Sequence, residues 1–352
     1  MQADGIRDSQ WHLRFLNIDA AHLLAEGAGV TVAVIDTGVD RHPDLDGSVL
    51  IGTVTDPRGS GDGTRDVVGH GTGMAGLIAA HGHGPGEGVL GIAPRAQILP
   101  ITDNATLAQG NGSYTADAVN WAIAHGADVI NISSSGGHVP ALKEAIDAAI
   151  AADIVVVAGV GNQPAQRVVG FPAYYPGVVA VGSVDRHGEI AQLSVSGKEV
   201  VIAAPGVDIM TTRLDGKYGT GSGTSDSTAI VAGAIALIRS RFPNLPASEV
   251  VRRLTATAID KGAPGRDEQY GYGVLNLMGA LTADVPSLSG SPTVSVPSAA
   301  VSDGVAAPEV PRGGGVGLAG VVGALVVVGG LITAFVLRGR ARRRADGAGP
   351  VP

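Results

Sequence analysis

The sequence contains no cysteine among its 352 residues. This absence excludes disulfide bonds, thiolate nucleophiles and cysteine-ligated metal sites. It does not fix the cellular compartment, because a chain of this length can bury a large core without disulfide bonds. Internal repeats are also missing, so the sequence does not predict an array of repeated modules.

Two further features are absent. Residues 1–8 are polar and acidic, with neither a basic stretch nor an apolar run, so no signal peptide is visible. The chain also lacks a basic surface: its formal net charge is -8, and five of its 24 Lys and Arg residues fall in the short run from Arg338 to Arg344. An acidic body argues against a nucleic-acid partner.

The C-terminal part differs in composition from the rest. Residues 284–315 are rich in Pro, Ser, Ala, Val and Gly and predict an extended linker. Residues 316–337 are 22 positions without a charge, enough for a helix across a bilayer core of roughly 30 Å. The basic residues 338–352 predict a cytoplasmic tail. We therefore expect a single-pass protein of the cell membrane.

This topology places residues 1–283 outside the cell. Such a body needs an export signal, and none is visible after Met1. We therefore expect the cellular protein to start upstream of Met1.

Within residues 1–283, apolar runs rich in β-branched residues recur, with helical patterns between them. The expected strands are residues 30–35, 97–101, 128–133, 154–160, 178–184 and 200–204. The expected helices are residues 70–81, 118–123, 140–150 and 249–258, and one that begins at Ser225. Near-continuous apolar strands suit a parallel sheet that is covered on both faces. The pattern therefore predicts an α/β fold: a doubly wound, mainly parallel sheet with helices on both faces.

Three residues carry the chemistry of acyl transfer. Asp36 follows the strand 30–35, His70 opens a helix between two glycines, and Ser225 precedes an apolar helical stretch. Alone, each has an ordinary role as a turn former, a surface histidine or a helix cap. Together, in the order Asp, His, Ser, they supply an orienting acid, a general base and a nucleophile. We expect them to meet at the carboxyl ends of the strands.

The reaction also needs donors for an oxyanion. The N–H of Ser225 lies at a helix N-terminus, where the dipole favours negative charge. Asn162 follows the strand 154–160, and its side-chain amide is a suitable second donor. The sequence therefore assigns Asn162 to a candidate oxyanion hole.

These motifs resemble those of subtilisin-like serine proteases, peptidase family S8, over about residues 10–280. The resemblance is carried by Asp36-Thr37-Gly38, His70-Gly71-Thr72, residues 158–162 and Gly223-Thr224-Ser225. With the predicted anchor, the chain is similar in particular to the mycosins associated with type VII secretion. The resemblance implies a polypeptide substrate, no required cofactor and type VII secretion components as partners. It also implies that Asp36 orients His70, that His70 deprotonates Ser225, and that Asn162 with the Ser225 N–H holds the oxyanion.

Three positions depart from the family pattern. Asp226 places a carboxylate next to Ser225, Ala229 replaces a common proline, and Gly73 replaces a common histidine. A carboxylate there is expected to raise the pKa of His70 or to oppose a nearby oxyanion. These departures leave open an alternative function, a catalytically silent scaffold of the same fold that binds secretion components.

The resemblance also implies a structural calcium ion. Its candidate ligand is Asp44, in the run His42-Pro43-Asp44-Leu45, with Gln10 as a second, weaker candidate. One carboxylate with one doubtful partner is thin support for a hard cation, so no metal ligand is assigned. We expect the nearby His81-Gly82-His83 to be solvated.

Two other enzyme classes, dinucleotide-dependent oxidoreductases and α/β-hydrolases, are disfavoured by the sequence. Residues 71–76 match the dinucleotide fingerprint G-x-G-x-x-G but lack the strand and the acidic residue that it requires. No G-x-S-x-G surrounds Ser225, which disfavours an α/β-hydrolase.

Overall fold

The structure is a computed structural model that describes residues 5–104 and 111–286. The predicted membrane helix 316–337, the tail 338–352 and all but the first three residues of the predicted linker lie outside these ranges. In the part described, none of the helices combines the length and apolar character needed to span a bilayer. The linker, the anchor and the tail therefore stay predictions.

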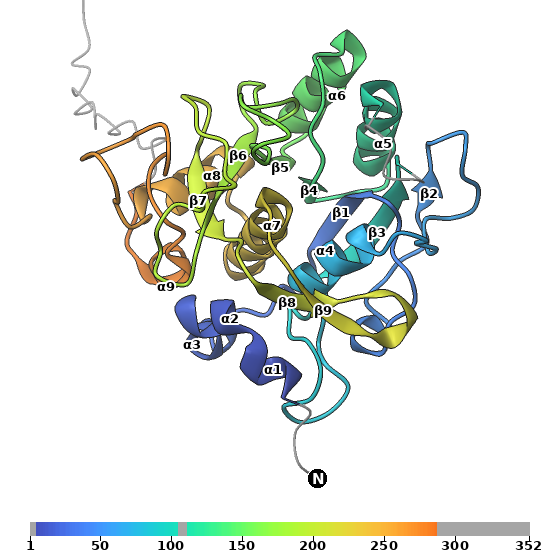
Figure 1. Ribbon diagram of the computed structural model, residues 1–352, viewed down its shortest axis with the longest axis horizontal. Helices are drawn as coiled ribbons and strands as arrows, with labels where there is room; N and C mark the ends of the chain where they lie inside the picture. The colour runs from blue at the N-terminus through green and yellow to red at the C-terminus, as the bar shows by residue number, and fades with distance from the viewer. Residues whose placement is uncertain (1–4, 105–110, 287–352) are drawn as a thin grey trace, which may run out of the picture. The chain divides into compact units, whose positions relative to one another are not determined.

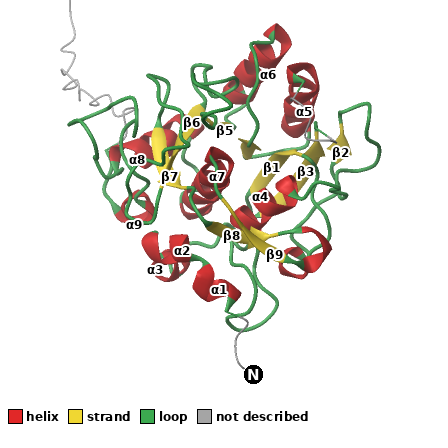
Figure 2. Ribbon diagram, viewed as in Figure 1, coloured by secondary structure: helices red, strands yellow, loops and turns green. Residues whose placement is uncertain are grey.

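A parallel sheet forms the centre of the fold (Figures 1 and 2). Its strands in the described residues are β1 (Thr31–Asp36), β2 (Thr53–Val54), β3 (Gln97–Thr102), β4 (Val129–Ile132), β5 (Val155–Gly159), β6 (Val179–Val184) and β7 (Ile202–Pro205). They lie in the order β2-β3-β1-β4-β5-β6-β7, and every neighbouring pair is parallel. Because β1 lies between β3 and β4, the strand order reverses at β1. Ligands of such sheets gather at the carboxyl end of this switch point, where Asp36 lies.

Helices cover the sheet on both faces, as the sequence predicted. Alternate residues of β1 point to opposite sides: Val32 and Val34 join one core, and Ala33 and Ile35 join the other. The first core includes α4 (His70–Ala79) and α7 (Thr224–Arg241), and the second includes α5 (Gly112–Ala124) and α6 (Pro140–Ala151). Figure 1 shows α5 and α6 side by side, apart from α4 and α7.

Helix α7 is buried along most of its length. Its residues from Asp226 to Ile238 are all buried, which explains why its apolar stretch shows no single helical face. The helix begins at Thr224 rather than at the predicted Ser225, so Ser225 is its second residue. A helix fixed on all sides gives Ser225 a rigid support.

The remaining elements are shorter. They are the helices α1 (Ile6–Ser9), α2 (Trp11–Phe15), α3 (Ile18–His22), α8 (Ala247–Ala256) and α9 (Leu277–Thr282), the 3-10 turns Pro43–Leu45 and Leu214–Gly216, and the strands β8 (Ile209–Thr212) and β9 (Tyr218–Gly221). The antiparallel pair β8–β9 was not predicted, because its sequence is rich in Thr and Gly and has no long apolar run.

Candidate active site

Asp36 and His70 form a hydrogen-bonded pair between the end of β1 and the start of α4. His70 Nδ1 lies 2.7 Å from Oδ1 and 2.9 Å from Oδ2 of Asp36. Asp36 Oδ1 also accepts from the N–H of Thr37 at 2.8 Å. The hydroxyl of Thr37 in turn accepts from the N–H of Gly71 at 2.9 Å, which ties the first turn of α4 to the end of β1. The carboxylate therefore fixes both the position and the tautomer of the imidazole.

The surroundings of His70 favour its protonated form. The negative charge of Asp36 raises the pKa of His70 to about 9, with further contributions from its hydrogen bond and from Asp226 and Asp66, against the opposing effect of burial. Asp66 was missed in the sequence. Its carboxylate accepts from the N–H groups of Val68, Gly69 and Thr72 and so builds the turn that starts α4. The sequence signal that could have identified this turn is an aspartate, Asp66, three residues before Gly69 at the start of the helix.

Ser225 lies at the same edge of the sheet, but its hydroxyl points to a neighbouring strand end. Ser225 Oγ donates to the carbonyl oxygen of Ser133 at 3.1 Å, and Ser133 Oγ donates to the carbonyl oxygen of Ser225 at 3.3 Å. Ser133 follows β4, which pairs with β1. Within the described residues, Ser225 Oγ makes no hydrogen bond to His70. The elements that carry Asp36, His70 and Ser225 thus meet at one edge of the sheet, with the Ser225 hydroxyl directed to Ser133.

Asn162 is oriented by the start of α7. Its Oδ1 accepts from the N–H of Thr224 at 2.9 Å, which leaves the Nδ2 donors for another partner. A Cβ atom built on Gly223 would lie 3.5 Å from Asn162 Nδ2 and 3.7 Å from the backbone nitrogen of Ser225. Both donors therefore border Gly223, and the N–H of Ser225 is one of the first-turn groups that lack an acceptor within the helix. Asp226 Oδ2 lies 3.7 Å from the same Cβ position, so the two donors suit an oxyanion hole that has a carboxylate beside it.

A cavity of about 170 Å³ opens beside the nucleophile. Besides Ser225 and Asn162, it is lined by residues 133–135, Gly159, Gly161, Gln166 and Thr224. A larger cavity of about 910 Å³ is lined largely by residues 39–49 and contains none of the predicted catalytic residues. Of these two cavities, the smaller one is the one that borders Ser225.

The residues around Asp44 do not fit a calcium ion. Asp44 is fully buried, and its carboxylate accepts from the ring Nδ1 of His83 at 2.6 Å and from the N–H of Val89 at 2.7 Å. Gln10 Oε1 accepts from the N–H of Leu90 at 2.8 Å. A cation needs several oxygens that face it, whereas N–H groups occupy both candidate ligands. In the part of the chain described, no group of three or more ionisable side chains could hold a metal.

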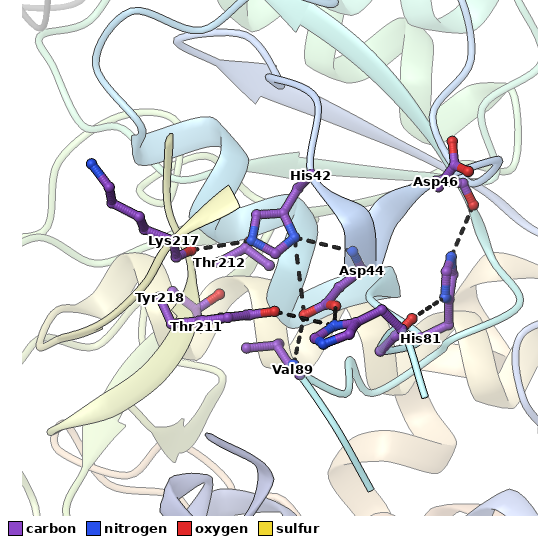
Figure 3. A network of polar contacts seen from close by, with 12 residues as sticks. His42, Asp44, Asp46, His81, Val89, Thr211, Thr212, Lys217 and Tyr218 are labelled. Atoms are coloured by element: carbon purple, nitrogen blue, oxygen red, sulfur yellow. Dashed lines mark hydrogen bonds and ion pairs between the residues drawn. The ribbon is translucent and has the colours of Figure 1, made fainter. Parts of the chain in front are cut away.

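The histidines around Asp44 all have polar partners, and His42 alone among the three is buried (Figure 3). His42 accepts from the N–H of Asp44 at Nδ1, 3.1 Å away, and Nε2 lies 3.1 Å from the carbonyl oxygen of Lys217. This pattern needs a neutral ring, and burial lowers the pKa of His42 accordingly. His81 Nε2 lies 2.9 Å from the carbonyl oxygen of Asp46. His81 and His83 are both exposed, as the sequence predicted, although each also has a hydrogen-bond partner.

Comparison with known proteins places this geometry in a family. The model of the subtilase family of peptidases matches residues 27–273. Subtilisin E of Bacillus subtilis (strain 168) is 38% identical over 262 residues, which cover 72% of this chain and 66% of subtilisin E, just under two thirds.

Two solved structures are also similar. MycP1 from Mycobacterium smegmatis superposes with a TM-score of 0.69 at 31% identity, over 78% of this chain and 85% of MycP1. The MycP3 protease of the type VII (ESX-3) secretion system has a TM-score of 0.68 at 32% identity, over 78% of this chain and 88% of MycP3. The chain belongs to the subtilase family of serine peptidases.

Proposed function

We propose that this chain is a serine endopeptidase in which Asp36, His70, Ser225 and Asn162 act together on a polypeptide. The observation that carries the proposal is the Asp36–His70 pair, 2.7 Å apart, at the sheet edge where Ser225 and the Asn162 amide also lie. Family membership supports the same reaction.

The geometry supports the following sequence of steps. Ser225 Oγ turns from Ser133 to His70 Nε2, gives up its proton and attacks the peptide carbonyl carbon. The imidazolium that forms is stabilised by Asp36, and the oxyanion accepts from the Ser225 N–H and Asn162 Nδ2. His70 then passes the proton to the leaving amine as the C–N bond breaks. A water molecule, deprotonated by His70, attacks the acyl ester and releases Ser225.

Peptide hydrolysis by the full-length chain in detergent tests this proposal. Ser225→Ala is expected to leave thermal unfolding unchanged and to lower kcat about 10⁶-fold. Equal hydrolysis by parent and variant would contradict the proposal, since the activity would then come from another nucleophile or a contaminant.

A silent scaffold is the second candidate function. Two observations favour it: the Ser225 hydroxyl is bonded to Ser133 rather than to His70, and Asp226 is buried next to it. This alternative predicts no hydrolysis by parent or by Ser225→Ala under any condition. The peptide assay therefore separates the two functions.

We also propose that the protein is anchored in the cell membrane with its catalytic body outside. The charge-free residues 316–337 and the Arg-rich tail support this topology. Because the chain has no cysteine, a single introduced cysteine gives an unambiguous label. An impermeant maleimide should label Gln192→Cys in intact cells and Ala348→Cys only after permeabilisation. The reverse labelling pattern, or recovery of the chain in the soluble fraction, would contradict the topology.

A link to type VII secretion is the final part of the proposal. It is supported by the likeness to the MycP3 protease of such a system. Mapping new N-termini of secreted and surface proteins should reveal cleavages that are present with the parent chain and lost with Ser225→Ala. Cleavages confined to proteins of another export route would count against the link.

A further inference from the structure

Asp226 is a buried carboxylate that the mechanism above does not use. It follows Ser225 in the first turn of α7 and is 5% exposed. Burial raises the pKa of Asp226 to about 6, and the positive charges of His70 and Arg213 oppose this shift. Among the described residues, no side chain donates a hydrogen bond to it. The ionised form of Asp226 is therefore stabilised by these two cations.

Arg213 approaches Asp226 from the loop after β8. A Cβ atom built on Gly221 would lie 3.0 Å from Arg213 Nη2 and 3.5 Å from Asp226 Oδ1. The guanidinium and the carboxylate thus border the same glycine. A side chain at position 221 would require the guanidinium to move by a few tenths of an ångström, whereas its contact with the carboxylate would be an ordinary one.

A second glycine makes room for the same guanidinium. A Cβ atom built on Gly73, in α4, would lie 2.7 Å from Arg213 Nη1, which is closer than carbon and nitrogen atoms approach without moving. Gly73 and Asp226 are two of the departures from the family pattern. Arg213 connects them in space, because it fills the volume that Gly73 leaves and reaches toward Asp226.

The charged groups around His70 come from four segments. They are Asp36 at the end of β1, Asp66 in the turn before α4, Asp226 on α7 and, beyond Asp226, Arg213. Asp36 and Asp66 are held by several N–H donors. In the described structure, Asp226 is bonded only to its own backbone N–H, so its side chain is less constrained than those of Asp36 and Asp66 and a neighbouring cation can change its position.

We propose that Arg213 is a positioning residue for the Asp226 carboxylate, which it meets beside Gly221, and that this pair sets the pH range over which His70 acts as the base. This inference rests on the proposed peptidase function. Asp226 stabilises the imidazolium, and Arg213 limits that effect by drawing the carboxylate toward β9. Gly73 leaves the space that the guanidinium occupies, and a Cβ atom there would move it.

Two readouts test the proposal: the pH profile of kcat/KM and the titration of the His70 ring followed by NMR. Asp226→Asn should move the midpoint of both to lower pH by on the order of one unit. Arg213→Gln should move both to higher pH, by a smaller amount, and should have no effect in the Asp226→Asn background. Gly73→Ala, which displaces the guanidinium, should resemble Arg213→Gln. Lys217→Gln, an exposed cation on the same turn, is the matched control and should move neither midpoint.

Two results would overturn the proposal. One is an unchanged midpoint in Asp226→Asn and in Gly73→Ala when both variants keep the parent unfolding temperature. The other is a shift by Arg213→Gln that persists in the Asp226→Asn background, since Arg213 would then act on His70 directly. The NMR titration needs no turnover, so failure of the peptidase proposal is distinguishable from failure of this one.

Discussion

Ser225 Oγ donates its hydrogen bond to the carbonyl oxygen of Ser133, 3.1 Å away, while His70 is held by Asp36 on the other side of the site. The Asp36–His70 pair is therefore formed in this structure, and the proposed nucleophile is held by a separate acceptor. Residues that act as one catalytic unit give non-additive losses of rate, so each is tested below by its own variant.

Loss of the Asp36 charge should impair catalysis without loss of the fold. In Asp36→Asn, the amide can stabilise the wrong imidazole tautomer and no longer balances the imidazolium, so kcat should fall by about 10⁴. The pKa of His70 should also fall, because Asp36 is the main cause of its increase. Steady-state kinetics and a thermal melt check this. A decrease of less than tenfold would show that Asp36 does not orient the base.

The parent enzyme should be more active at alkaline pH. His70 must be neutral to accept a proton, and its pKa is raised to about 9. Protonation therefore removes the base as the pH falls through this value, and kcat/KM should rise with pH toward a plateau above it. The pH profile of peptide hydrolysis measures the midpoint. A midpoint at or below the ordinary histidine value of about 6.5 would contradict the account.

Asn162→Ala should lower kcat by about 10²–10³ and change KM little, because its Nδ2 donors act on the oxyanion rather than on the ground state. Gln163→Ala is the control, since the Gln163 amide donates to the carbonyl oxygen of Ser194 instead. Kinetics on one peptide substrate compare the two. Equal losses in both variants would point to a general disturbance of this loop.

Stability should fall in mild acid because of His12. This side chain is fully buried, neither ring nitrogen has a partner in the described structure, and burial lowers its pKa to about 3. Between about pH 6.5 and pH 3 the unfolded chain therefore binds a proton that the folded chain does not, so the free energy of unfolding decreases as the pH falls. His12→Leu should reduce this decrease in thermal melts. The exposed His187→Gln should not, and equal pH dependence in parent and His12→Leu would reject the role of His12.

Calcium should have little effect on thermal unfolding. The Asp44 carboxylate already accepts from His83 and Val89, so chelation by EDTA or added calcium should leave Tm unchanged. His83→Ala should lower the free energy of unfolding by about 1–3 kcal/mol, because a buried carboxylate loses a donor. A large increase in Tm on addition of calcium would show that an ion displaces His83.

The core strands and the positions of the proposed catalytic residues were predictable from the sequence because their signals are local. The six predicted strands are near-continuous apolar runs, and each is present in the sheet. Asp36, His70 and Ser225 each lie at a strand end or helix start that the flanking residues mark. The acceptor of the Ser225 hydroxyl was not predictable, because Ser133 lies 92 positions away.

The contacts that distinguish this chain were missed for the same reason. His83 is hydrogen-bonded to Asp44, 39 positions away. Only the folded chain shows that the partner of this carboxylate is an imidazole, where the sequence suggested a calcium ion. The role of Arg213 could not be predicted from the sequence. This residue lies between β8 and β9, and neither strand has an apolar pattern that marks it. Gly73 and Asp226 were recognised as departures, but their connection through Arg213 is visible only in three dimensions.

The most direct test of the central claim is the site of covalent labelling by a fluorophosphonate probe, identified by mass spectrometry of the full-length protein. The account predicts one labelled residue, Ser225, with labelling lost in Ser225→Ala and strongly slowed in His70→Ala. Labelling of a different residue, or equal labelling of the parent and His70→Ala, would contradict it.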